Sequence, residues 1–249
     1  RGAGLGGREH VIDASVEAVH HFVGVADFNG DGMPDVATAE MNQGDDPDLV
    51  TVYLNQGHGE TWQPLRIGSL GSHNMQIVDI DGDFFPDLFG ANWQFDDADA
   101  VYPVTLWRNA LQSKQSAWQR KVIDVDRPGK ALFIDAADID RDGEIDIVSG
   151  GYWYKNPGVS RGHWQRHDIG EPIGNFVLAR DFDGDGDTDI LGSSYRGKSP
   201  PPLYRRALNR LGIWAYAYGD PGHHFALATN NGNGQFSVDV GLPEARGDY

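Results

Sequence analysis

The chain contains no cysteine among its 249 residues, so it has no disulfide framework and sulfur chemistry gives no information about its compartment. Basic side chains are few. The 20 Lys and Arg stand against 37 Asp and Glu, and the resulting charge of −17 disfavours nucleic acids and anionic membranes as partners. No apolar run is long enough to cross a bilayer. An N-glycosylation sequon is also absent, which is consistent with a bacterial source. Because the chain starts at Arg1 without Met or a signal peptide, we expect a mature or trimmed product.

What the chain does contain is four Asp-rich loops with nearly identical spacing. Loops 1 to 4 span residues 27–35, 79–87, 138–146 and 181–189, and each has Asp or Asn at positions 1, 3, 5 and 9. So many carboxylates in a tight turn repel one another unless a cation lies among them. Hard oxygen ligands in a flexible loop suit calcium, which takes roughly six to eight oxygens. We predict about four structural calcium ions, held by positions 1, 3, 5, 7 and 9: Asp27, Asn29, Asp31, Met33, Asp35, Asp79, Asp81, Asp83, Phe85, Asp87, Asp138, Asp140, Asp142, Glu144, Asp146, Asp181, Asp183, Asp185, Asp187 and Asp189.

Two other interpretations of these loops were weighed. An EF-hand requires a bidentate Glu at position 12 and a helix on each side, whereas position 12 is here occupied by Thr38, Gly90, Ser149 and Gly192, and the flanks have the composition of strands. Asp-Gly hairpin turns without an ion are the second alternative. Loop 2 is the weakest predicted site, because Phe84 replaces the Gly found at position 6 of the other loops.

Calcium also bears on the compartment and on the net charge. Sites of this type are useful where calcium is abundant, so we expect a secreted protein, either extracellular or periplasmic. Four bound ions would reduce the net charge from −17 to about −9.

Four strand-like runs recur in every repeat unit. The first ends at the Asp-rich loop, the second follows it, the third ends at a shared Asn, and the fourth begins with an aromatic residue. Four antiparallel strands per unit, repeated along the chain, are typical of a β-propeller blade. We therefore predict an all-β fold with one β-propeller domain over residues 1–249. Its repeat units span 19–68, 71–124, 130–170 and 173–241, and its long insertion spans 193–223.

The third and fourth runs of each unit are the most regular. We predict third strands at 50–55, 104–109, 152–156 and 225–230, and fourth strands at 62–67, 118–123, 164–169 and 236–240. The aromatic residues that begin the fourth strands are expected to pack between blades. The shared asparagines are expected to cap turns: Asn55, Asn109, Asn156 and Asn230.

These motifs carry a family resemblance over nearly the whole chain. The segments 27–35 (Asp-Phe-Asn-Gly-Asp-Gly-Met-Pro-Asp), 153–158 (Trp-Tyr-Lys-Asn-Pro-Gly) and 230–236 (Asn-Asn-Gly-Asn-Gly-Gln-Phe) resemble the FG-GAP/VCBS-type calcium-binding propeller repeat, which also forms the head of integrin α subunits. The resemblance implies the fold and the bound calcium. It leaves the function open, because the family includes lectins, polysaccharide lyases and adhesion proteins.

The N-terminus does not fit the repeat. Residues 9–13 match 120–124 in sequence and precede their Asp-rich loop by the same distance, so we predict an extra outer strand at 9–13. Since the last unit already has a fourth strand, we expect the chain to be part of a larger propeller, completed by a longer parent protein or by a closing partner chain.

Polar and aromatic residues converge on the face opposite the Asp-rich loops, which we call the mouth. Strand alternation places there the starts of the first strands, the ends of the second strands and the long loops that follow them. We predict catalytic residues His21, His73, Tyr195 and Arg196, and ligand-binding residues Glu40, Asn92, Trp93, Lys130, Tyr152 and Asn175. In the plainer interpretation, these groups only satisfy strand ends.

Two classes of function follow from this mouth. In the first, it binds carbohydrate or a surface glycoconjugate, through aromatic stacking and hydrogen bonds. In the second, it is a lyase acting on uronate-containing glycans. His21 or His73 would then be the base, Tyr195 or Tyr152 the acid, and Arg196, Lys130 or Asn175 the stabilising group. A third version has His21 and His73 hold a catalytic metal for hydrolysis.

Overall fold

The fold is built entirely from antiparallel β-sheets. A computed structural model describes residues 9–17, 19–41, 44–45, 47–91, 103–110, 118–126, 133–158, 162–194 and 225–240. Sixteen strands form four sheets of four strands, and the strands of each sheet are consecutive in the chain. The predicted all-β class and the four-stranded antiparallel blades are confirmed.

The strands are grouped into four blades, numbered in chain order. Blade 1 contains β1 (His20–Ala26), β2 (Asp35–Glu40), β3 (Val50–Asn55) and β4 (Trp62–Gly68). Blade 2 contains β5 (Asn74–Val78), β6 (Asp87–Ala91), β7 (Val104–Asn109) and β8 (Trp118–Asp124). Blade 3 contains β9 (Ile134–Ala137), β10 (Asp146–Ser149), β11 (Tyr152–Lys155) and β12 (Gln165–Asp168). Blade 4 contains β13 (Ile173–Arg180), β14 (Asp189–Ser194), β15 (Phe225–Asn230) and β16 (Phe236–Asp239).

Each Asp-rich loop joins the first two strands of its blade. In blade 1 the hairpin pairs Ala26 with Asp35, and in blade 2 it pairs Val78 with Asp87. The second strands of blades 2 and 3, β6 and β10, are buried along their whole length, as is the third strand β3. Strands buried on both faces have no side that faces water, and apolar residues predominate in them. The blades must consequently be covered by their neighbours.

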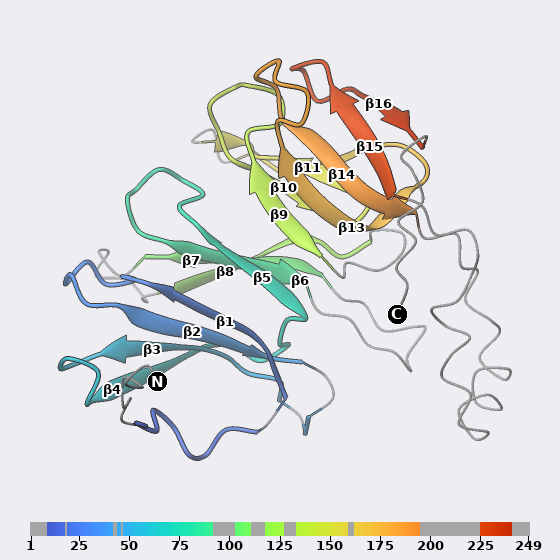
Figure 1. Cartoon of the computed structure of the whole chain (residues 1–249). Coiled ribbons are helices and arrows are strands. Elements are labelled where there is room, and N and C mark those ends of the chain that lie inside the picture. The colour runs from blue at the N-terminus through green and yellow to red at the C-terminus, as the bar shows by residue number, and fades with distance from the viewer. Residues whose placement is uncertain are drawn as a thin grey trace, which may run out of the picture.

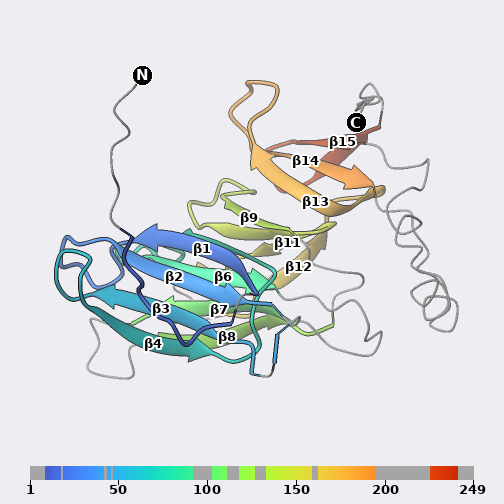
Figure 2. The same ribbon diagram turned by 60° about the horizontal axis from the view of Figure 1, so that its bottom comes forward.

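Hydrophobic cores fill the spaces between successive blades. Three clusters join blade 1 to blade 2, blade 2 to blade 3 and blade 3 to blade 4. Figure 2 shows the sheets of blades 1 and 2 stacked face to face. Three of the four aromatic residues predicted to pack between blades take part in these clusters: Trp118, Trp164 and Phe236. The fourth, Trp62 of blade 1, belongs to none of the three, and its Nε1 donates to Gly59 O at 3.1 Å. The ring of Trp118 meets Phe28 of the preceding blade edge to face, with centroids 5.8 Å apart.

The four blades form an open series. They follow one another from blade 1 (blue) to blade 4 (orange), with the first strands β1, β5, β9 and β13 as successive neighbours (Figure 1). Within the described residues, none of the three core clusters joins blade 4 to blade 1. The series therefore has two end faces.

Residues 9–13, where an extra outer strand is predicted, form no strand within the described chain. They pair with none of the four sheets of the described chain, so their pairing with a further blade or a partner chain stays a prediction. The segment instead lies against blade 1, where the Tyr53 hydroxyl donates to Asp13 Oδ2 at 3.1 Å. None of the described residues belongs to a helix of the length and hydrophobicity that a membrane crossing requires.

Candidate metal centres and the opposite face

The Asp at position 1 gives each loop its shape. In loop 1, Asp27 Oδ1 accepts the Gly30 N–H at 2.7 Å and Asp27 Oδ2 accepts the Gly32 N–H at 2.8 Å. Loop 4 repeats this arrangement, because Asp181 accepts the N–H groups of Gly184 and Gly186 at 2.7 and 3.1 Å. A carboxylate that collects N–H groups from its own loop folds the chain around itself, which places the following side chains close together.

The Asp at position 9 joins the loop to the third strand. Asp87 Oδ2 accepts the Ile80 N–H at 3.0 Å and Asp87 Oδ1 accepts the Asn109 N–H at 2.6 Å. The equivalent pair of bonds is made in every blade by a fully buried carboxylate: Asp35, Asp87, Asp146 and Asp189. The sequence reasoning gave these residues only a metal-binding role. This second role has no signal in the sequence, because it depends on where the third strand ends in space.

Burial makes the ionised form of these carboxylates costly. Desolvation raises the pKa of Asp87 and of Asp146 to about 7, although two backbone N–H bonds to each carboxylate act in the opposite direction. The pKa of Asp35 is raised for the same reason. A cation beside position 9 would favour the ionised form. The protonation state of the position-9 Asp and the geometry of its loop are therefore coupled to metal binding.

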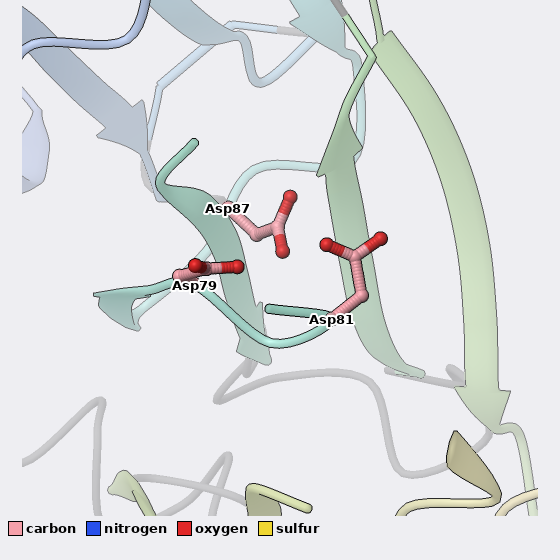
Figure 3. Close-up of side chains that lie close together, drawn as sticks. All are labelled: Asp79, Asp81 and Asp87. Carbon is pink, nitrogen blue, oxygen red and sulfur yellow. The ribbon is translucent and has the colours of Figure 1, made fainter. Parts of the chain in front are cut away.

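Three of the loops bring carboxylates together in groups that fit a metal ion. Asp79, Asp81 and Asp87 offer oxygens within 4.8 Å of one another, and Figure 3 shows these carboxylates gathered at the turn that follows β5. The same positions form the groups of loops 3 and 4: Asp138, Asp140 and Asp146, and Asp181, Asp183 and Asp189. In loops 2 and 3, the position-3 oxygens Asp81 Oδ1 and Asp140 Oδ1 are buried without a hydrogen-bond partner, which suits a metal ligand.

Positions 5 and 7 lie outside these groups. The position-5 carboxylate accepts the N–H of position 7 in all four loops, at distances of 2.8 to 3.0 Å. Their role as ligands stays a prediction. Loop 1 has Asn29 at position 3, whose Nδ2 donates to Asp31 Oδ2 at 2.9 Å, so loop 1 lacks the position-3 carboxylate that the other loops have.

Residues 27–90 match the family model of the FG-GAP-like repeat. The matched stretch begins at position 1 of loop 1 and ends in β6, so it contains loops 1 and 2 and most of blade 1. The resemblance stated from the motifs is thus confirmed for this part of the chain. No curated protein matches the chain.

Within this repeat arrangement, basic side chains enter three of the Asp-rich loops. Lys155 Nζ donates to Asp140 Oδ2 and, at 2.6 Å, to Asp142 Oδ2 of loop 3. Arg108 pairs with Asp81 of loop 2. In loop 4, Asp187 Oδ1 accepts from Arg141 Nη1 of the preceding blade at 2.6 Å. The sequence reasoning missed these pairs.

The residue before the shared Asn decides which loop receives a cation from its own blade. Arg108 and Lys155 occupy this place in blades 2 and 3, whereas blades 1 and 4 have Leu54 and Thr229. Burial disfavours the charged Lys155 side chain, but its hydrogen bonds to Asp140 and Asp142 outweigh this and raise its pKa. In the metal-free chain, two loops therefore contain an internal counter-ion.

Loop 2 contains backbone strain at the predicted position. Phe84 has φ 71° and a side chain that is 92% exposed, whereas Gly32, Gly143 and Gly186 take the same place in the other loops with φ of 83° to 90°. A residue with a Cβ pays about 1–2 kcal/mol for this left-handed conformation. The predicted weakness of loop 2 thus has a structural cause.

Phe84→Gly is therefore expected to stabilise the protein by about 1 kcal/mol, because Gly adopts the left-handed conformation without strain. The exposed Phe84 ring contributes almost no buried surface, so its removal costs little. Urea unfolding in the presence of calcium measures the difference. Phe84→Ala is the matched control, since it removes the exposed ring and keeps the Cβ. If the Ala variant gains as much as the Gly variant, the exposed ring and not the backbone is the source of instability.

The mouth brings His21 and His73 together. The two imidazole rings come from blades 1 and 2, and their centroids are 5.3 Å apart with an interplanar angle of 44°. His21 is exposed at the start of β1, and His73 immediately precedes β5. His20 lies beside them, with Nε2 3.9 Å from Glu40 Oε1. The two histidines predicted at the mouth thus lie close together, whereas their catalytic role stays a prediction.

Other predicted mouth residues are less accessible or undescribed. Glu40 is buried, and its Oε2 accepts the Leu49 N–H at 2.7 Å, so this carboxylate is committed to the fold. Tyr152 lies at the start of β11 with the Arg166 guanidinium over its ring, at 5.4 Å from the centroid. The Asn175 backbone belongs to β13, but its side chain is outside the described part. The remaining candidates lie outside the described residues, as does the insertion from residue 195: Asn92, Trp93, Lys130, Tyr195 and Arg196.

Proposed function

We propose that this chain is a secreted, calcium-stabilised propeller protein that binds carbohydrate or a surface glycoconjugate at its mouth. The observation that carries the proposal is the His21–His73 pair, two polar rings from neighbouring blades that meet 5.3 Å apart on the face opposite the Asp-rich loops. Such a pair offers hydrogen-bond donors and acceptors on a rigid scaffold, which is how hydroxyl-rich ligands are recognised.

The donor chemistry of the loops favours calcium as the stabilising ion. All the grouped ligands are carboxylates, and calcium prefers such oxygens over the nitrogen and sulfur ligands that select zinc. FG-GAP-like repeats commonly bind calcium. The loops lie at the blade junctions, away from the mouth, so we assign four ions with a structural role. Abundant calcium outside the cell is consistent with secretion.

Unpaired polar atoms near the mouth support a polar ligand. His20 Nδ1, Asn74 Oδ1 and Ser149 Oγ are buried without a hydrogen-bond partner in the described chain, and all three residues lie at strand ends on this side. Buried polar atoms without partners are costly. Ordered water or the hydroxyl groups of a glycan would satisfy them.

Calorimetric titration of neutral and uronate-containing polysaccharides into the calcium-loaded protein tests this proposal. Heat pulses that saturate and return to baseline are expected for a binding module. The double variant His21→Ala/His73→Ala is expected to weaken binding by about tenfold or more, because two hydrogen-bonding rings are lost. His58→Asn is the control, since His58 lies in the β3–β4 turn and Asn tolerates its φ of 49°.

The same titration separates binding from catalysis. Heat flow that persists until the polysaccharide is consumed would replace the binding proposal with the lyase or the metal-assisted hydrolase, with His21 or His73 as base or ligand. Unchanged binding in the double variant would show that the mouth is not the site.

A further inference from the structure

Each junction between blades is made by one repeated connector. The side-chain Nδ2 of the shared Asn donates to the main-chain oxygen of position 2 in the preceding blade's loop. This bond joins Asn109 to Phe28 at 2.7 Å, Asn156 to Ile80 at 3.1 Å and Asn230 to Ile139 at 2.7 Å. The position-2 side chains beneath these bonds are fully buried: Phe28, Ile80 and Ile139.

The first strand of each following blade completes the junction. The residues two and four positions before the loop pack against the preceding blade. Met75 is 2% exposed in blade 2, Ile134 is 3% exposed in blade 3, and Ala179 is 1% exposed in blade 4. A junction therefore has two halves. The preceding blade supplies the position-2 side chain and its main-chain carbonyl. The following blade supplies the shared Asn and the apolar face of its first strand.

The two ends of the blade series each show one half without its counterpart. On blade 1, Val23 and Val25 of β1 are 70% and 61% exposed, and the one acceptor of Asn55 Nδ2 among the described residues is Pro34 O of its own blade. On blade 4, the position-2 residue Phe182 is 42% exposed, and no described Asn reaches its carbonyl. Blade 1 thus shows an Asn and an apolar strand face, and blade 4 shows a position-2 side chain and its carbonyl. These are the two halves of one junction.

We propose that blade 4 of one copy docks on blade 1 of a second copy through this same junction. Phe182 of one copy would enter the space over Val23 and Val25 of the other, and its carbonyl would accept from Asn55. Because the contact is head to tail, it either closes into a ring or continues as a filament. Two copies of four blades give a ring of eight, which is within the usual range of four to eight blades. A closed ring leaves no end face.

The edge of blade 4 offers a place for the N-terminal segment of the second copy. Among the described residues, β16 pairs with β15 from Asn230 to Leu227, and none of them pairs with Phe225 or Ala226 on that side. In blade 2 the equivalent residues Val104 and Thr105 pair with Asp124 and Val122. Residues 11–13 are the counterparts of 122–124 in the repeat.

The N-terminal segment already has the shape of the missing strand end. Asp13 Oδ1 accepts the Ser15 N–H at 2.8 Å, as Asp124 Oδ1 accepts the Asp126 N–H at 2.8 Å. Val11 and Ile12 are 62% and 38% exposed. In the paired assembly, these residues would continue the outer edge of the neighbouring copy's blade 4.

Light scattering coupled to size exclusion tests the assembly in calcium. The expected mass is about twice the 27.3 kDa of one chain. Val23→Glu places a charge on the blade 1 end, and Phe182→Gln removes the apolar group from the blade 4 end without adding charge to loop 4. Each variant alone should be monomeric, because both joints of a two-copy ring contain the changed residue. Val122→Glu, on the outer strand of blade 2, is the matched control and should remain paired.

Mixing the two variants gives the decisive result. The Val23→Glu chain keeps an intact blade 4 end and the Phe182→Gln chain keeps an intact blade 1 end, so the mixture should regain a paired species with one sound joint. Circular dichroism of each variant confirms that the fold is kept. A wild type that stays monomeric up to about 100 µM, a paired Val23→Glu chain, or a mixture that does not re-associate would each overturn the proposal.

Discussion

Removal of calcium by EGTA is expected to lower the thermal midpoint of unfolding by about 20 °C or more. If each of the four loops is held at about 100 times its dissociation constant, each ion stabilises the fold by about 2.7 kcal/mol. For a chain of this size, one kcal/mol corresponds to about 2–4 °C. The loops lie at the blade junctions, where Asp87 and Asp146 link position 2 to the third strand. Loss of the ions therefore weakens the junctions between blades as well as the loops themselves.

Differential scanning calorimetry at matched ionic strength measures this effect. Magnesium at the same concentration is the control, because its smaller, strictly octahedral shell fits a flexible carboxylate loop poorly. Calcium should restore the midpoint after chelation, whereas magnesium should restore little of it. A midpoint that EGTA leaves unchanged would mean that the Asp-rich loops hold no ion and act only as hairpin turns.

The metal-free protein should also respond to pH in an unusual direction. The pKa of Asp87 and Asp146 rises from 3.8 in the unfolded chain to about 7 in the fold, so the folded state binds more protons between these values. Stability in EGTA therefore falls as pH rises from about 4 to about 7, by at most about 1.4 kcal/mol per pH unit for each carboxyl. With calcium bound, the ionised forms are held and acidification should destabilise the protein instead. The same scans at about pH 4 and about pH 7, the two ends of this window, show whether the slopes have opposite signs.

The strands and the loops could be predicted because each is determined by local chemistry. The third strands end at Asn55, Asn109 and Asn230 as predicted. The cause is the turn that follows, in which Asn55 Oδ1 accepts the N–H groups of Gly57 and Gly59 at 3.2 and 2.9 Å. Trp118, Trp164 and Phe236 were rightly placed between blades, since a large apolar group on an otherwise polar outer strand is buried only against a neighbouring blade, whereas Trp62 lies in none of the three clusters.

What could not be predicted depends on contacts between distant residues. The shared Asn has two roles, and only the turn could be inferred, because its bond to the preceding blade spans 76 to 91 residues. The extra strand at 9–13 was inferred from the match of these residues to 120–124, yet a strand forms only where an edge is available, and none of the described sheets pairs with this segment. The convergence of His21 and His73 was predicted from counting along the strands, which worked because adjacent blades have the same length there.

Replacement of Lys155 by Met is expected to tighten calcium binding in loop 3 by about fivefold. The Lys155 ammonium occupies the carboxylates of Asp140 and Asp142, so calcium must displace it before binding. A partly exposed ion pair of this kind contributes about 1 kcal/mol, and about 1.4 kcal/mol corresponds to tenfold in affinity. The same change should lower the stability of the protein in EGTA, because loop 3 then has no counter-ion for its carboxylates.

The opposite change can be tested at the equivalent position of blade 4, immediately before the shared Asn. Thr229 occupies it in blade 4, and Thr229→Lys should bring an ammonium towards Asp183 and weaken calcium binding in loop 4. Lys155→Arg keeps the charge and should leave the affinity of loop 3 nearly unchanged. Calorimetric titration of calcium into EGTA-treated, desalted protein gives the affinities, and thermal scans in EGTA give the stabilities. If Lys155→Met binds calcium as the wild type does, the pair with Asp140 is not in competition with the ion. If Lys155→Met binds calcium more tightly and Thr229→Lys binds it more weakly, the residue before the shared Asn sets how strongly each blade depends on calcium.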